Sequence, residues 1–293
     1  MTKLGESIRI GARRKRRVRN CLAPAFVVLL GGMVVACASA KPRYQVIKGH
    51  LPIAKDAVAA VETAQFSAAR FQASDGTILP YRFLAPSHPE KGKRYPLVLQ
   101  LHGSGGIGTD NAMQLDRLAR TWAMPDVRDR YHAYVLVPQF PIRSANYGPP
   151  AADQHSEPSA ALDAALELVE RYALDEGVDR SRIYATGFSM GGSAAWLSPM
   201  LRPELFAAIV PVSGIAPDNA HAPAFRRLPV LVIHGNADPE NPITSDIRFT
   251  REIARIGGTE VELREYEGLD HQMPDDIYPG YEWRDWLFSH RRQ

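Results

Sequence analysis

The fold is decided by Gly187-Phe188-Ser189-Met190-Gly191, a G-x-S-x-G pattern between a predicted strand and a predicted helix. Residues 182–186 are rich in β-branched and aromatic side chains, which indicates a short buried strand. Residues 193–197 are typical of the start of a helix. A sharp strand-to-helix turn needs glycine on both sides, because the neighbouring backbone packs within reach of a Cβ. Such a turn exposes the hydroxyl of Ser189, so we predict a nucleophile rather than an ordinary αβ connection.

Strands and helices alternate along the chain on both sides of this turn. The predicted strands are residues 69–73, 78–84, 97–101, 134–137, 182–186, 207–212, 230–234 and 261–266. The predicted helices are residues 116–122, 159–172, the segment after Ser189, 245–256 and 281–289. This alternation predicts an α/β fold with a mostly parallel, doubly wound sheet flanked by helices. In such sheets a ligand binds beyond the carboxyl ends of the strands.

The first 36 residues are typical of an export signal. They contain eight Lys or Arg and one acid, and residues 21–36 carry no charge. Sixteen uncharged residues are short for a membrane-spanning helix and fit the apolar region of a signal peptide. Cleavage before Cys37 would give a bacterial lipoprotein, and cleavage after Ala40 an ordinary secreted protein. We favour lipidation at Cys37, and an uncleaved anchor is a third reading.

Each cleavage route predicts an exported protein, placed in the bacterial periplasm, on the outer membrane as a lipoprotein, or secreted in soluble form. Cys21 and Cys37 are the only cysteines, so we expect neither a disulfide nor a cysteine metal site in the folded part. We expect residues 37–67 to form a tether, with a helical segment over 55–65, and residues 68–293 to form the catalytic domain.

The positive charge of the chain is concentrated in the export signal. The full sequence has a formal net charge of +3, but residues 37–293 contain 27 basic and 31 acidic residues, a net charge of −4. Nucleic acid is therefore not an expected partner. The sequence predicts contact with a membrane only through a lipid at Cys37, and it does not indicate an oligomeric state.

A serine nucleophile needs a base and a third group that orients the base. Asp238 follows the predicted strand 230–234, and His271 follows the last predicted strand. The order Ser189, Asp238, His271 is the chain order of an α/β-hydrolase triad. Asp218, Asp246 and Asp270 are weaker candidates for the acid. For His102 and His234, which each precede a glycine at a strand end, we predict structural hydrogen bonds.

The tetrahedral intermediate of acyl transfer carries a negative oxygen that needs two backbone donors. One donor is predicted to be the N–H of Met190, at the start of a helix whose dipole favours negative charge. The second should come from the glycine-rich loop of residues 101–106, where glycines allow close approach to a substrate. We predict the N–H of Ser104, with Gly103 as the alternative.

With these positions assigned, the chain resembles the α/β-hydrolase superfamily over about residues 69–290. Residues 101–111, LHGSGGIGTDN, with Gln114-Leu115, resemble the exported esterases known as predicted peptidases. That group is similar to the phospholipase/carboxylesterase and dienelactone-hydrolase-like branches. Residues 138–141, PQFP, fit as well, although the branch often has a cysteine where Phe140 stands. The resemblance implies a serine hydrolase of carboxylic esters that needs no metal and no cofactor.

Two loops bear on the substrate. The superfamily often inserts a cap where residues 214–228 lie, and about fifteen residues leave no room for a large one. Residues 139–158 are rich in Pro, Gly and aromatic side chains, and we expect them either to rim the cleft or to form a plain surface connection. A lightly covered site suits small-molecule or carbohydrate esters, with a short acyl group or a sugar alcohol. A serine peptidase and a non-catalytic binding protein on a hydrolase scaffold are the alternatives.

Overall fold

The computed structural model describes residues 43–54, 56–151 and 153–292. The chain divides after residue 37 into two units, and all the described residues belong to the second. The predicted export signal, with Cys21 and Cys37, lies outside the described residues. Among the described helices, none has the length and the hydrophobicity required to span a bilayer.

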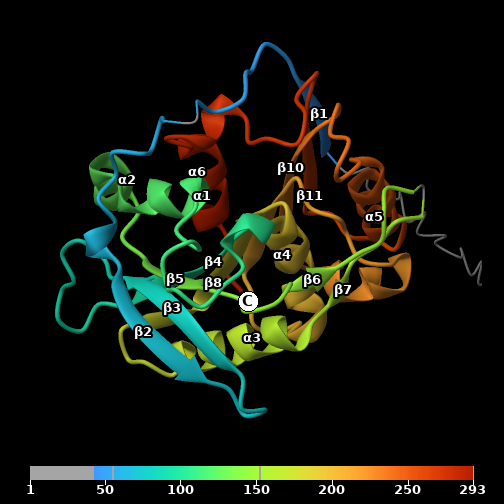
Figure 1. Ribbon diagram of the computed structural model, residues 1–293. Helices are drawn as coiled ribbons and strands as arrows, with labels where there is room; N and C mark the ends of the chain where they lie inside the picture. The colour runs from blue at the N-terminus through green and yellow to red at the C-terminus, as the bar shows by residue number, and fades with distance from the viewer. Residues whose placement is uncertain (1–42, 55, 152, 293) are drawn as a thin grey trace, which may run out of the picture. The chain divides into compact units, whose positions relative to one another are not determined.

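Nine strands of the described residues form one sheet (Figure 1). In spatial order they are β1 (Arg43–Ile47), β11 (Val261–Tyr266), β10 (Val230–Gly235), β9 (Ala208–Val212), β8 (Val178–Phe188), β4 (Tyr95–Leu101), β5 (Tyr134–Pro138), β3 (Ile78–Leu84) and β2 (Ser67–Gln72). The pairs β2–β3 and β3–β5 are antiparallel, and every other neighbouring pair is parallel. Every residue of β4, β9 and β10 is buried, because both faces of a parallel sheet are covered. The predicted mostly parallel sheet is confirmed.

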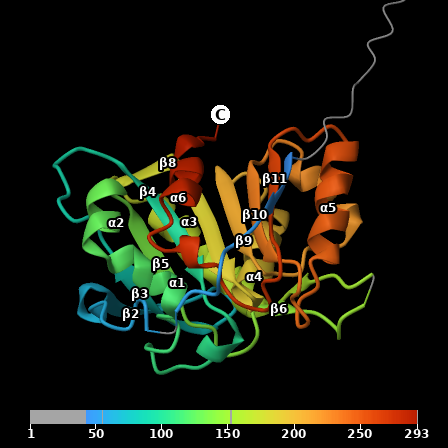
Figure 2. The ribbon, with the colours of Figure 1, turned by 90° about the horizontal axis from the view of Figure 1, so that it is seen from above.

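Helices cover both faces of this sheet (Figure 2). The helices α1 (Arg117–Arg120), α2 (Pro125–Arg130) and α6 (Tyr281–Ser289) pack into one core, and α3 (Ala160–Ala173), α4 (Met190–Leu201) and α5 (Thr244–Arg255) pack into the other. The shorter elements are β6 (Ala145–Asn146), β7 (Glu157–Pro158) and the 3₁₀ turns η1 (Thr63–Gln65), η2 (Ser104–Gly106), η3 (Thr121–Ala123), η4 (Asn219–Phe225) and η5 (Asp275–Ile277). Between β9 and β10 the chain forms only η4, so the fold has no large cap at that point.

The segment predicted as a tether is part of this domain from residue 43 onward. Strand β1 lies parallel to β11, in register from Arg43 opposite Glu262 to Ile47 opposite Tyr266. Residues 56–65 form turns and η1 instead of the predicted helical segment. The local sequence did not show this pairing, because the partner strand comes from the far end of the chain.

Residues 51–53 brace the loop that carries His271. The N–H of Ile53 donates to the carbonyl of Met273 at 2.9 Å, and the N–H of Asp275 donates to the carbonyl of Leu51 at 2.8 Å. The side chain of Ile53 is buried in the core between the two segments. The first described residues therefore help to hold the loop after β11 in place.

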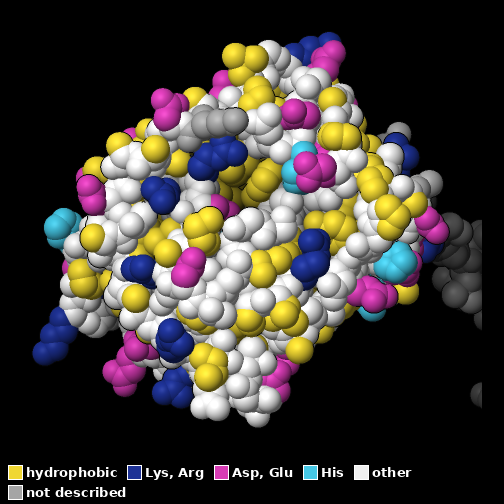
Figure 3. Space-filling view, viewed as in Figure 1, with side chains coloured by type: hydrophobic (Ala, Val, Ile, Leu, Met, Phe, Trp, Pro, Cys, Tyr) yellow, Lys and Arg dark blue, Asp and Glu magenta, His cyan; other side chains and the backbone are white. Residues whose placement is uncertain are grey.

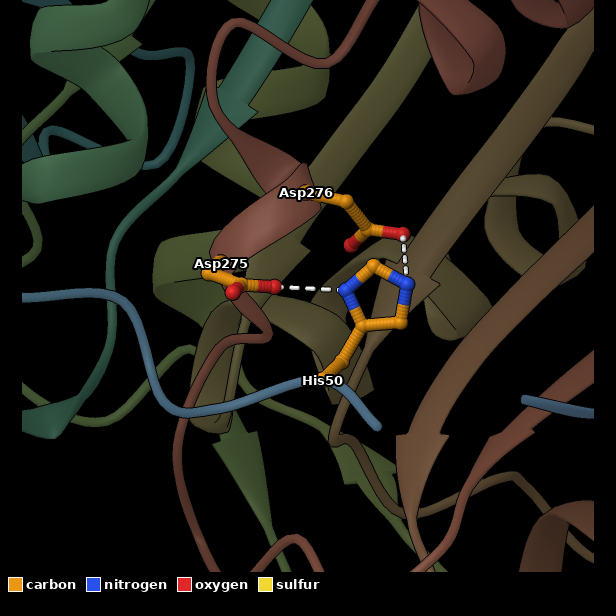
Figure 4. A group of neighbouring side chains, drawn as sticks. All are labelled: His50, Asp275 and Asp276. Carbon is orange, nitrogen blue, oxygen red and sulfur yellow. Dashed lines mark hydrogen bonds and ion pairs between the residues drawn. The ribbon is translucent and has the colours of Figure 1, made fainter. Parts of the chain in front are cut away.

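A side-chain cluster adds to this brace (Figure 4). The Nδ1 of His50 lies 2.5 Å from Oδ1 of Asp275, and its Nε2 lies 3.7 Å from Oδ2 of Asp276. The hydrogen bond to Asp275 raises the pKa of His50. The hydroxyl of Tyr266 donates to Asp276 at 2.7 Å. The ligand atoms lie close enough together for a metal ion. The carboxylates approach different nitrogens of one ring, however, so the hydrogen bond to Asp275 and the ion pair with Asp276 account for the arrangement.

Packing of β4 should dominate the stability of the domain. We expect Leu99→Ala to lower the free energy of unfolding by about 2–5 kcal/mol, because Leu99 is fully buried and the variant leaves a cavity. Ile78→Ala is the matched control, since that side chain is 52% exposed and its loss should cost less than about 0.5 kcal/mol. Urea unfolding of both variants measures the difference, and equal losses would contradict this account of the core.

Candidate active site

Ser189 lies on the turn between β8 and α4 in a strained conformation. Its φ is 59° and its ψ is −120°, which non-glycine residues rarely adopt. A Cβ at Gly191 would collide with the backbone carbonyl of Leu101, so only glycine allows α4 to begin this close to the end of β4. The turn is therefore held by tight backbone packing, as the glycines of the motif predicted.

Ser189, His271 and Asp238 meet at the carboxyl ends of β8, β11 and β10. The Nε2 of His271 lies 2.8 Å from the Oγ of Ser189. The Nδ1 of His271 lies 2.7 Å from Oδ2 of Asp238. The three side chains thus form one hydrogen-bonded chain, in which Ser189 and Asp238 are each only 7% exposed. Phe188 packs its ring against the His271 ring, with the centroids 5.1 Å apart.

Backbone hydrogen bonds fasten the Asp238 loop to the His271 loop. The N–H of Asn236 donates to the carbonyl of Tyr266, and the N–H of Ala237 donates to the carbonyl of Leu269, both at 3.0 Å. The Oδ1 of Asn236 accepts from the N–H of Gly268 at 2.8 Å. The loops after the neighbouring parallel strands β10 and β11 are thereby fixed to each other through backbone atoms, independently of the contact between Asp238 and His271.

The carboxylate of Asp238 is held in its ionised form. Burial alone would raise its pKa, but hydrogen bonds from His234, His271 and the N–H of Asn241 outweigh burial and hold the pKa of Asp238 well below its usual range. The Oδ1 atom accepts from the N–H groups of Glu240 and Asn241 at 2.9 and 2.8 Å. An ionised carboxylate fixes an imidazole in one orientation, which suits a side chain that must exchange protons.

The two histidines at strand ends, His102 and His234, both make hydrogen bonds inside the domain, as predicted. The Nε2 of His102 accepts from the N–H of Phe140 at 3.0 Å, and burial lowers the pKa of His102 to about 4. His234 is fully buried between Asp246 of α5 and the Asp238 loop. Asp246, a rejected candidate for the acid of the triad, lies 2.7 Å from Nδ1 of His234.

The predicted oxyanion donors each begin a helical element. Met190 is the first residue of α4, and Ser104 is the first residue of η2. Gly103, the alternative to Ser104, approaches the Ser189 side chain closely. The N–H of Gly103, however, faces the carboxylate of Asp116. Burial raises the pKa of Asp116 to about 6, and the backbone N–H groups of Ala119, Gly103 and Leu118 oppose this rise.

A cleft of about 590 Å³ opens above these residues. Its lining includes Ser189, His271, the loop 103–106 and Glu240. In Figure 3 the face viewed has a hollow with a hydrophobic floor. Leu115 and Phe188, which belong to the motifs quoted above, also line the cleft. The sequence did not point to Glu240 or to the remaining lining residues, which are Val58, Ala59, Ala112, Met113, Asp116, Arg117, Arg120 and Met273.

The loop of residues 139–158 does not contribute to this cleft. None of its described residues lines the cavity, so of the two expectations the plain surface connection fits and the rim does not. It is held elsewhere, with the N–H of Ser156 bonded to the carbonyl of Ala216 and the short ladder of β6 and β7 closing it. That side of the cleft is lined instead by residues 112, 113, 115–117 and 120.

Comparison with known proteins identifies relatives of the same fold. Residues 147–277 match the phospholipase/carboxylesterase family model. A putative esterase, NocK, from Nocardia uniformis subsp. tsuyamanensis is 31% identical over 57% of this chain and 47% of its own. A probable feruloyl esterase C from Aspergillus terreus is 28% identical over 59% of this chain and 60% of its own.

A solved structure of an esterase is also similar to this chain in three dimensions. The crystal structure of a thermostable esterase superposes with a TM-score of 0.70 at 31% identity, covering 78% of this chain and 64% of the other. The predicted α/β-hydrolase fold and the predicted resemblance to esterases are confirmed. The chain spans roughly half to two thirds of the length of these relatives.

The lowered pKa of Asp238 predicts how stability depends on pH. Because the folded state holds this pKa below the value of about 3.9 in an unfolded chain, the stabilisation is complete above that pH and is lost as the pH falls below it. We therefore expect Asp238→Asn to be less stable than the wild type at pH 6 and the difference to shrink by pH 3. Urea unfolding of both proteins at pH 6 and pH 3 measures this difference in stability.

Asp129→Asn, at an exposed position, is the control for this series. It should change stability little at either pH. A gap between Asp238→Asn and the wild type that stays constant from pH 6 to pH 3 would contradict the assigned role of the hydrogen bonds.

Proposed function

We propose that this chain, which has the α/β-hydrolase fold and resembles its esterases, is an exported serine hydrolase that cleaves carboxylic esters through an acyl-enzyme. The observation that carries the proposal is the unbroken hydrogen-bonded chain from Ser189 through His271 to Asp238, at 2.8 and 2.7 Å. Export and a lipid at Cys37 are supported by the basic residues and the uncharged stretch that precede the domain.

Each side chain has a defined task in this mechanism. The Nε2 of His271 accepts the Ser189 proton as the hydroxyl attacks the ester carbonyl, and Asp238 holds Nδ1–H and stabilises the imidazolium. His271 then donates the proton to the departing alcohol, and a water molecule repeats the cycle on the acyl-enzyme. Because the imidazole must be neutral to accept a proton, activity should fall below about pH 6.

The N–H groups of Met190 and Ser104 are the proposed donors to the oxyanion. Met190 stands at the first position of α4, where backbone N–H groups have no partner within the helix. Ser104 is preferred to Gly103 because the N–H of Gly103 faces the Asp116 carboxylate. Loss of one such donor typically lowers turnover by about 10²–10³.

The open cleft favours short acyl or sugar-linked esters. The lining is formed by loops and α1, with no large cap between β9 and β10 to enclose a long chain. The similarity to a probable feruloyl esterase fits an aromatic or sugar-linked ester. The similarity to esterases also favours ester over peptide bonds, the alternative kept in the sequence analysis.

Replacement of the nucleophile tests the proposal directly. We expect Ser189→Ala to abolish both hydrolysis of 4-nitrophenyl acetate and labelling by a fluorophosphonate probe, because Ser189 is the hydroxyl that His271 contacts within the described part of the chain. The control is Ser87→Ala, since Ser87 lies outside the cleft and should keep full labelling. Absence of labelling in the wild type would favour a non-catalytic binding protein.

The acyl preference tests the substrate class. We expect kcat/KM on 4-nitrophenyl esters to be highest for short acyl chains and to fall toward C16, because the cleft is open and only η4 connects β9 to β10. Acetylated and feruloylated sugars should be hydrolysed in the same panel. Rates that peak at the long end would contradict the proposed substrate class without affecting the proposed nucleophile.

A further inference from the structure

Helix α1 presents two arginines to the cleft that contains Ser189. Arg117 and Arg120 both line the cleft and are half-buried. Among the described residues, no carboxylate lies within 4.0 Å of either guanidinium. The charge of Asp116 acts on Arg117 only from a greater distance. The cleft therefore contains two positive charges that lack a close counter-ion.

Backbone carbonyls hold both side chains in place. Arg117 donates from Nη1 to the carbonyl of Ile53 at 3.3 Å. Arg120 donates from Nε to the carbonyl of Leu115 at 2.9 Å and from Nη1 to the carbonyl of Ala59 at 3.5 Å. These bonds orient the guanidinium groups without neutralising them, so the remaining N–H groups are available to a ligand.

The opposite wall of the cleft carries negative charge. Glu240 lines the cleft with its side chain 71% exposed, and its Oε2 lies 3.7 Å from Nε2 of His271. Figure 3 shows basic side chains at one rim of the hollow and a histidine beside an acidic side chain at the opposite rim. This separation of charge would turn an anionic part of a substrate toward α1 and away from Glu240.

We propose that Arg117 and Arg120 form a subsite for an anionic group of the substrate, a carboxylate, sulfate or phosphate carried on the ester. Guanidinium groups bind such oxyanions with paired, charge-assisted hydrogen bonds. The inference rests on the proposed ester hydrolysis and adds the charge class of the substrate to it.

Matched pairs of esters test the subsite. 3-Acetoxybenzoate and its methyl ester differ in a charge on the alcohol side, and mono-4-nitrophenyl adipate and 4-nitrophenyl hexanoate differ in a charge on the acyl side. 3-Acetoxyphenyl phosphate distinguishes phosphate from carboxylate. We expect kcat/KM for an anionic member to exceed that of its neutral partner by about tenfold, and the Arg117→Gln/Arg120→Gln variant to bring this ratio to about one.

The control for this test is Arg227→Gln, an exposed arginine outside the cleft, which should keep the wild-type ratio. Arg117→Lys/Arg120→Lys, which keeps the charge, should retain part of the preference. Anionic esters that are no better than neutral ones in the wild type, or a preference that survives in the glutamine variant, would overturn the subsite. Failure to hydrolyse any ester would instead overturn the proposed function.

A second inference concerns the charge of His234, which lies behind Asp238. Its Nε2 is 2.7 Å from the carbonyl oxygen of Asn241, which has no proton to give, so Nε2 must carry one. Its Nδ1 is 2.7 Å from Oδ2 of Asp246. The other oxygen of Asp246 accepts from Trp196 Nε1–H at 2.8 Å, so both oxygens of this carboxylate accept hydrogen bonds. Both ring nitrogens therefore donate.

We infer that His234 is a buried imidazolium and a positioning residue for the proposed reaction. Its Nε2 lies 3.4 Å from the same Asp238 oxygen that is bonded to His271. Among the described residues, the charged groups facing His234 are Asp238, from its own loop, and Asp246, from α5. A fixed cation at this point keeps Asp238 ionised and disfavours a second positive charge in the same hydrogen-bonded chain, which extends activity to lower pH.

The acid limb of the kcat/KM profile on a neutral ester tests this inference. We expect His234→Gln and Asp246→Asn each to move the limb to higher pH by about one unit, since each removes the cation behind Asp238. His221→Gln, at an exposed histidine, is the control. A merely structural role would lower stability and leave the limb in place, and that result would overturn the inference.

Nuclear magnetic resonance of protein labelled with ¹⁵N-histidine gives an independent measurement. We expect one ring, absent from the spectrum of His234→Gln, to carry protons on both nitrogens at pH 8, where an ordinary histidine is neutral. A His234 ring with a single protonated nitrogen at pH 7 would overturn the inference even if the variants lost activity.

Discussion

The close packing of two backbone turns supports the whole site. Gly191 lies against the carbonyl of Leu101, and no larger residue could start α4 at this distance. The contact fixes Ser189 at a positive φ and places the loop 103–106 beside it. Ser189, the proposed nucleophile, and the loop proposed to bind the oxyanion are thus positioned by the same constraint, which acts through backbone atoms and does not depend on flexible side chains.

The sheet positions Asp238 and His271 relative to Ser189. Parallel strands end at one edge, so the loops after β8, β10 and β11 lie near each other whatever their sequences. Hydrogen bonds between the loops then set the spacing, with Asn236 bonding to the turn before His271. Within this frame Asp238 is bonded to His271 and lies 3.4 Å from Nε2 of His234, and its low pKa follows from that environment.

The sequence predicted what short-range patterns determine. The alternation of strands and helices gave the sheet, and the position of Ser189, Asp238 and His271 after strands placed them at one edge. The catalytic roles of these residues are still a proposal. Strand β1 was missed because its pairing with β11 depends on a partner far along the chain. Helix α2 was missed because its six residues, with Pro125 at the first position, are too few to show a helical period.

The rim of the cleft escaped prediction for a similar reason. Arg117 and Arg120 lie on a four-residue helix whose distance from Ser189 is set by the fold, and no motif marks them. The loop 139–158 had a composition typical of a binding loop, but it packs against the segment after β9. Composition shows that a loop is exposed and does not show which cavity it faces.

The brace formed by residues 51–53 has a practical consequence for making the protein. A shortened gene beginning at residue 68 looks reasonable from composition, yet its product would lack the edge strand and the contacts of Ile53 and Leu51 with the loop after β11. His271 would then lie on a loop without these contacts in an otherwise folded molecule. Cloning boundaries should therefore be drawn upstream of residue 43, and a protease-trimmed preparation should be checked at this end before its inactivity is interpreted.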